Sequence, residues 1–281
     1  MYPSNDRRPI TGDRHPVLYT VLVVAALILV ACRLSPMLRH LSWSAPATPA
    51  STGPAARPVV SVRGGPFDNT VAVHYAIGKA GIVLPAAKAV DGFSASYVDA
   101  GLKKVRGALI AGRLDERMLV RHDTSGFAAL LAPFQRTWAR DMRLGAVTTW
   151  IDPAVKLDPK YPPRVSGTVT YAVVAYEGRR HLQITTNFVW AYGFRTGEPP
   201  YAAVHDTTRW EFFEDPLLPR DQWGLFVADM DYYLYAVDCA ASENELLSPD
   251  QHPRVDTVHD PERPDAYLSP DHPMQVRDGC P

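Results

Sequence analysis

The segment Val17–Cys32 (VLYTVLVVAALILVAC) contains no charged residue and no proline. As a helix it is about 24 Å long, somewhat shorter than the ~30 Å hydrocarbon core of a bilayer. Snorkelling of Arg33 and local bilayer thinning offset that difference. The stretch that follows is rich in proline and cannot bury an all-round apolar helix. The sequence therefore predicts a membrane segment at residues 17–34 rather than a helix of a soluble core.

Three interpretations of this membrane segment stay open. The first is a single-pass anchor with residues 1–16 in the cytoplasm, favoured by the arginines that precede the segment. The second is a lipoprotein signal, because Leu29–Cys32 (LVAC) is similar to the bacterial lipobox and Cys32 would then be lipidated. The third is a cleaved secretory signal, which the long apolar core and Arg33 disfavour. All three predict a body outside the cytoplasm, and the first two hold it at the cell membrane.

Composition divides the rest of the chain into three parts. Residues 35–58 form a Pro/Ala-rich linker, typical of an extended tether. Residues 59–245 form an α+β domain, and residues 246–281 form a Pro/Asp-rich irregular tail that we expect to lie on the domain. Lys and Arg total 29 against 30 Asp and Glu, without the basic excess of a nucleic-acid binder. The expected partners are the membrane and another envelope protein or wall component, and no nucleic acid.

Within the domain, helical periodicity is followed by strand periodicity. Pro133 should kink or end the second predicted helix, whose apolar face would include Phe127, Phe134 and Trp138. We expect helices over residues 94–112 and 124–143, and strands over residues 165–177, 181–194, 207–214 and 225–239. Only three residues separate the first two strands, which predicts a hairpin. This order predicts an α+β fold with helices packed on a curved antiparallel sheet, and it resembles the NTF2-like cone.

A second resemblance concerns residues 66–145. The stretch PFDNTVAVHYAIGKAGIVLPAAKAV, followed by a helix and LDERML, is similar to a recurrent segment of membrane-anchored proteins of high-GC actinobacteria. The predominance of Arg over Lys fits such a genome. The resemblance implies an anchored protein but carries no activity with it.

Aromatic residues supply the candidate binding site. Alternation within the strands predicts that Trp190, Tyr192, Trp210 and Tyr232 share the concave side of the sheet, with Phe226 also facing inward. This side is either a packed core or an apolar pocket with one or two polar groups. The opposite face of residues 181–194 should be exposed to water.

The cysteines give a definite expectation. Cys239 and Cys280 both lie in the part of the chain that we place outside the cytoplasm, where disulfides form. We therefore expect a Cys239–Cys280 disulfide that ties the tail to the end of the last strand.

The sequence contains no recognisable catalytic, cofactor or metal motif. Asp229 and Asp231 project from the same face of one strand, and we interpret them as exposed carboxylates; His205 is expected to be solvated. We therefore expect no catalytic residue, no metal and no cofactor, and a binding or assembly role in the cell envelope. The alternative is an enzyme that uses Asp, His and Tyr for acid–base chemistry in an NTF2-like pocket.

Overall fold

A computed structural model describes residues 64–145, 147–176, 178–214, 217–251, 264–276 and 280. The predicted membrane segment, which includes the possible lipidation site Cys32, lies outside these residues. The predicted linker at 35–58 also lies outside them. Within them, no helix is both long enough and apolar enough to span a membrane.

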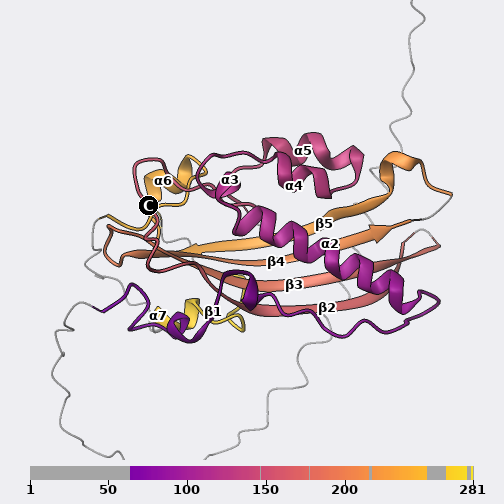
Figure 1. Ribbon diagram of the computed structural model, residues 1–281, viewed down its shortest axis with the longest axis horizontal. Helices are drawn as coiled ribbons and strands as arrows, with labels where there is room; N and C mark the ends of the chain where they lie inside the picture. The colour runs from indigo at the N-terminus through magenta and orange to yellow at the C-terminus, as the bar shows by residue number, and fades with distance from the viewer. Residues whose placement is uncertain are drawn as a thin grey trace, which may run out of the picture. The chain divides into compact units, whose positions relative to one another are not determined.

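The described part of the chain folds as an α+β domain with an open antiparallel sheet (Figure 1). The five strands lie side by side in the order β1-β2-β3-β4-β5. The strands are β1 (Ala76–Ile77), β2 (Arg164–Tyr176), β3 (Arg179–Gly193), β4 (Tyr201–Phe213) and β5 (Gly224–Tyr235). The helices are α2 (Ala95–Arg113), α3 (Glu116–Leu119), α4 (Ser125–Leu130), α5 (Arg136–Asp141), α6 (Cys239–Glu243) and α7 (Pro264–Tyr267). The 3₁₀ turns are η1 (Val71–His74), η2 (Gly78–Gly81), η3 (Pro133–Gln135) and η4 (Arg220–Gln222).

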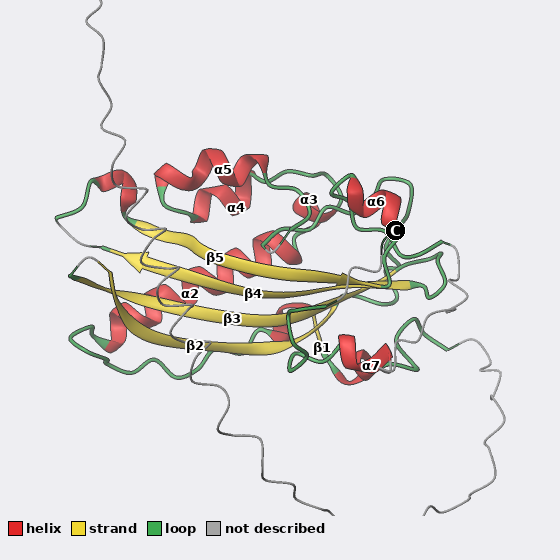
Figure 2. Ribbon diagram, turned by 180° about the vertical axis from the view of Figure 1, so that it is seen from behind, coloured by secondary structure: helices red, strands yellow, loops and turns green. Residues whose placement is uncertain are grey.

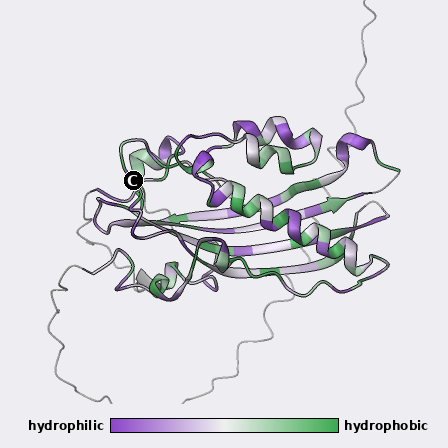
Figure 3. Ribbon diagram, in the orientation of Figure 1, coloured by the Kyte–Doolittle hydropathy of each residue, from purple (hydrophilic) through white to green (hydrophobic). Residues whose placement is uncertain are grey.

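Helix α2 crosses one face of the sheet: it lies in front of the strands in Figure 1 and behind them in Figure 2. Ser94 caps it by accepting a hydrogen bond from the Tyr97 amide. Apolar and polar residues alternate along its ribbon (Figure 3). Four apolar residues at helical spacing along it are all buried: Val98, Leu102, Val105 and Leu109.

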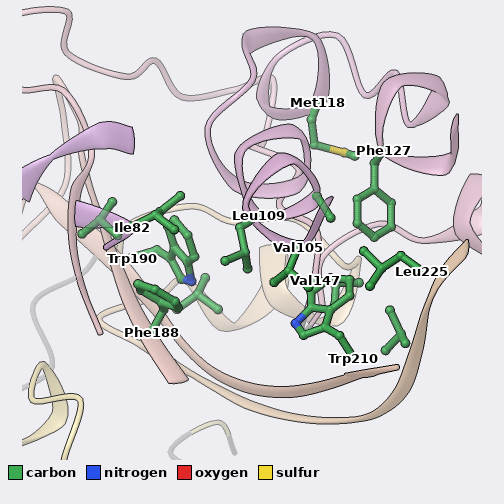
Figure 4. Packing of buried hydrophobic residues seen from close by; sticks show 14 of the residues in the cluster. Ile82, Val105, Leu109, Met118, Phe127, Val147, Phe188, Trp190, Trp210 and Leu225 are labelled. Carbon is green, nitrogen blue, oxygen red and sulfur yellow. The ribbon is translucent and has the colours of Figure 1, made fainter. Parts of the chain in front are cut away.

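The main core lies between α2 and the concave face of the sheet (Figure 4). Strand β3 contributes alternate apolar residues to it, as the alternation predicts: Leu182, Ile184, Phe188, Trp190 and Tyr192. Phe194, just after the strand, also joins this core. Trp210 and Phe212 of β4 join them. The hairpin of β2 and β3 is confirmed, with Val165 opposite Trp190.

The opposite face of the sheet is not simply wet, contrary to the expectation. Val189 and Ala191 of β3 are buried in a second cluster with Phe67, Ala72 and Leu268. These last three come from the N-terminal segment before β1 and from the C-terminal tail, which meet on this face. Leu268 of the tail therefore packs on this face together with the N-terminal segment.

Two expectations about local packing are wrong. The predicted second helix is interrupted at Pro133, as expected, because α4 ends at Leu130 and η3 begins at Pro133; the expectation that failed is that its apolar face would continue through Phe134. The apolar face does not continue across this break, so Phe134 is 48% exposed. In β5, a bulge lies opposite Arg209 and Trp210 and shifts the alternation, so Leu225 and Val227 are buried in place of Phe226.

Candidate functional site

The four aromatic residues predicted to share a binding face are not brought together in an open pocket. Trp190, Tyr192 and Trp210 are fully buried in the main core. Tyr232 lies opposite Asp206 in the β4–β5 register but is 41% exposed. The concave face is thus filled where the three buried rings lie.

An ion pair lies inside this filled core. Arg113 ends α2, and its Nη2 is 3.0 Å from Oδ2 of Asp206 on β4; neither side chain is exposed to solvent. The same carboxylate oxygen accepts a hydrogen bond of 2.6 Å from Trp190 Nε1. Burial raises the pKa of Asp206 to about 6, although the charge of Arg113 and the hydrogen bonds from Trp190 and Arg113 act in the opposite direction.

The guanidinium of Arg113 also organises the chain around it. Nη1 donates to Thr149 Oγ1 and to the Thr148 carbonyl, and Nη2 donates to the Gly145 carbonyl. Tyr192 donates to the Arg113 carbonyl at 3.0 Å, and burial raises the pKa of its hydroxyl to about 12. These contacts satisfy most of the buried polar atoms, although Arg113 Nε and Asp206 Oδ1 have no hydrogen-bond partner among the described residues. Because both charged side chains are fully enclosed, we regard the pair as structural.

A second polar cluster lies on the opposite face of the sheet, under the tail. His205 is 1% exposed, contrary to the expectation of a solvated side chain. Its Nδ1 is 2.9 Å from the Tyr233 hydroxyl and its Nε2 is 2.6 Å from Asn187 Oδ1. Tyr233 donates to the Tyr267 carbonyl, and Asn187 donates to the Pro270 carbonyl. Burial, and secondarily the charge of His272, lowers the pKa of His205 to about 4.

An open cavity of about 620 Å³ lies beside α6, and we call it the α6 cavity. Its lining residues are His122, Arg143, Trp150, Asp152, Pro153, Asp238, Ala240, Ala241, Asn244 and Leu246. The backbone of residues 150–152 forms hydrogen bonds with that of Leu247, joining two of the contributing segments. This volume lies within the range of about 300–1,000 Å³ typical of small-molecule sites.

Stacked side chains form one part of the α6 cavity. The rings of His122 and Trp150 are parallel, with centroids 4.5 Å apart, and the Arg143 guanidinium lies 5.6 Å from the Trp150 ring centroid. His122 Nε2 is 2.9 Å from the Ile151 carbonyl; a carbonyl only accepts, so this nitrogen carries the proton. His122 has a φ of 56°, a conformation that non-glycine residues rarely adopt and that is often found at functional sites.

The opposite part of the lining belongs to α6 and its flanks. Asp238 caps α6 by accepting a hydrogen bond from the Ala241 amide. The disulfide between Cys239 and Cys280 joins the first residue of α6 to the tail, with a Cα–Cα distance of 5.5 Å, and confirms the predicted pairing. Glu245, just after α6, has a φ of 58° and forms an ion pair with Arg143 at 3.7 Å. The disulfide therefore ties this wall to the tail.

The α6 cavity was not predicted from the sequence. Its residues come from three distant segments, and none forms a motif. The aromatic and charged residues near 143–153 were the available signal, but only the fold shows that they meet α6. Asp229 and Asp231 are exposed, as predicted, and Asp229 forms an ion pair with Arg209. Within the described ranges, no group of three or more His, Cys, Asp or Glu residues could hold a metal ion.

No protein-family model, curated protein or solved structure matches this chain.

Proposed function

We propose that this chain is an envelope protein held at the cell membrane by Val17–Cys32, with its α+β body outside the cytoplasm and a binding role without catalysis. The α6 cavity is the binding site in this proposal. The family of anchored actinobacterial proteins and the NTF2-like architecture stay predictions from the sequence.

The observation that carries the proposal is the contrast between two regions of the domain. The concave face of the sheet, where an NTF2-like pocket was one expectation, is filled around Trp190, Trp210 and the buried ion pair. The α6 cavity is open to solvent and lined by side chains of varied chemistry. A disulfide ties its wall to the tail, and such bonds persist outside the cytoplasm.

The alternative function is an acid–base enzyme, and one observation favours it. Asp206 has a pKa raised to about 6 and lies within the same polar network as Tyr192, as general acid–base groups do in active sites. Against it, both Asp206 and Arg113 are fully enclosed, so a substrate would require the core to open. Binding at the α6 cavity requires no such rearrangement.

The experiment that tests the proposal is crosslinking and affinity capture of the full chain from native membranes. We compare the wild type with a variant carrying Asp152→Asn and Asp238→Asn, which changes two lining carboxylates. The proposal predicts a crosslinked product that the double variant forms in reduced yield, and protease access to the body in intact spheroplasts. An intact chain found in the cytosol, protected until lysis, would refute it.

A further inference from the structure

We infer that the α6 cavity binds an uncharged, hydroxyl-rich ligand, a neutral saccharide. This inference rests on the proposed binding function and adds the chemical class of the ligand. Three features support it: the charges that line the cavity, the polar atoms there that have no hydrogen-bond partner, and the covering of the Trp150 ring by His122 and Arg143.

The lining carries charges of both signs, two carboxylates and one guanidinium. Two carboxylates, Asp152 and Asp238, would repel an anion. The guanidinium of Arg143 lies in the same lining and would repel a cation. It also occupies a position over the Trp150 ring, where a ligand cation would otherwise form a cation–π contact. An uncharged ligand avoids both repulsions.

Hydrogen-bonding capacity remains on both sides of the cavity. Asp152 and Asp238 each use one carboxylate oxygen for a backbone amide, at 2.8 and 2.9 Å, and Asn244 uses its amide nitrogen for the Ala240 carbonyl. In the described part of the chain, no hydrogen bond is formed by the second carboxylate oxygen of Asp152 or Asp238. The same holds for the side-chain oxygen of Asn244 and for the two amino groups of Arg143. The cavity thus offers several acceptors and one planar donor group.

Hydroxyl groups match this arrangement because each one can donate to a carboxylate or amide oxygen and also accept from a guanidinium. A ligand with several adjacent hydroxyls can satisfy acceptors on Asp152, Asp238 and Asn244 while accepting from Arg143. Its less polar C–H surfaces can contact Pro153, Ala240 and Leu246. Among small uncharged molecules, saccharides combine these two surfaces.

The test uses the full chain in a detergent without a sugar headgroup. Neutral trisaccharides of glucose, galactose, mannose and N-acetylglucosamine are examined by saturation-transfer NMR at about 10 mM, where a site with Kd ~1 mM would be about nine-tenths occupied. Spermidine and inorganic phosphate serve as the cationic and anionic probes.

Two variants probe the cavity without removing a cap or turn. Asp152→Asn and Asp238→Asn keep the oxygen that accepts from the backbone, because Asn forms the same turn and the same helix cap. Each exchanges the second carboxylate oxygen for a donor. Asp115→Asn is the matched control, since Asp115 caps α3 in the same way, lies outside the cavity lining and changes the charge equally.

The inference predicts that at least one trisaccharide binds, with affinity about tenfold lower in each cavity variant and unchanged in Asp115→Asn. It is overturned if no trisaccharide binds, if the cavity variants bind as the wild type does, or if only spermidine or phosphate gives a signal that these variants abolish. Membrane crosslinking that still depends on Asp152 and Asp238, without saccharide binding, would overturn the ligand class alone and leave the proposed function standing.

Discussion

Arg113 and Asp206 form an ion pair that is wholly enclosed by the core, with 3.0 Å between Nη2 and Oδ2. The two residues are 93 positions apart in the chain, one at the end of α2 and one in the middle of β4. The pair therefore fixes where the end of the helix lies on the sheet. A buried charge without its counter-charge strongly destabilises the folded state, so removal of either residue should destabilise the domain.

Substituting Asp206→Asn should lower the free energy of unfolding by about 3–5 kcal/mol, because it leaves the Arg113 guanidinium buried without a counter-charge. Asp229→Asn is the control: it breaks the ion pair with Arg209, whose side chains are about half exposed, and should cost less than about 1 kcal/mol. Urea unfolding followed by tryptophan fluorescence measures both. Equal unfolding midpoints for the two variants would contradict a structural role for the buried pair.

His205 should make the docking of the tail sensitive to acid. Its pKa is lowered to about 4 in the folded domain, so between that value and its ordinary value of 6.5 the undocked state binds more protons. The stabilisation that His205 contributes to the docked tail is therefore at its maximum above pH ~6.5, and it decreases as the pH falls below that value. Protection factors for hydrogen exchange in residues 264–276 should therefore decrease from about pH 7 to about pH 5.

The groups around His205 define the control for that measurement. It faces Tyr233 and Asn187 on the sheet and Tyr267 and His272 on the tail, while Asp206 projects from the other face. The raised pKa of Asp206 gives the opposite pH dependence of stability: the contribution of Asp206 increases as the pH falls through about 6. Local protection of the tail is therefore measured rather than global stability. His205→Gln should abolish the pH dependence, and its persistence in this variant would assign the effect to another group.

The sequence predicted those parts of the fold that depend on local periodicity. The face of β3 that carries Trp190 and Tyr192 follows from alternation. The bulge in β5 has no sequence signal, so the burial of Phe226 was predicted wrongly. His205 is buried because a tail distant in sequence covers it. The α6 cavity likewise depends on long-range packing, which periodicity does not encode.

Loss of the Cys239–Cys280 disulfide should destabilise the domain by about 4 kcal/mol in the chain-entropy model, because the bond closes a loop with a sequence separation of 41. The double substitution to Ser is compared with the oxidised wild type in urea. Ligand binding at the α6 cavity should weaken as well, because the bond holds the first residue of α6. An unchanged urea midpoint would mean that the tail is held by its contacts with the sheet alone.

Two glycines of α2 should respond to alanine in opposite directions. A Cβ on Gly107 would meet only Leu130, at an ordinary 3.7 Å, so Gly107→Ala should stabilise the domain by about 0.5–1 kcal/mol through its higher helix propensity. A Cβ on Gly112 would overlap the Val147 carbonyl oxygen, which belongs to backbone and cannot rotate away. Gly112→Ala should therefore cost about 3 kcal/mol, despite the same gain in propensity. Thermal unfolding of both variants separates the effects. If both substitutions raised Tm, α2 would not approach residue 147 as closely as the buried contacts of Arg113 with Thr148 and Thr149 require.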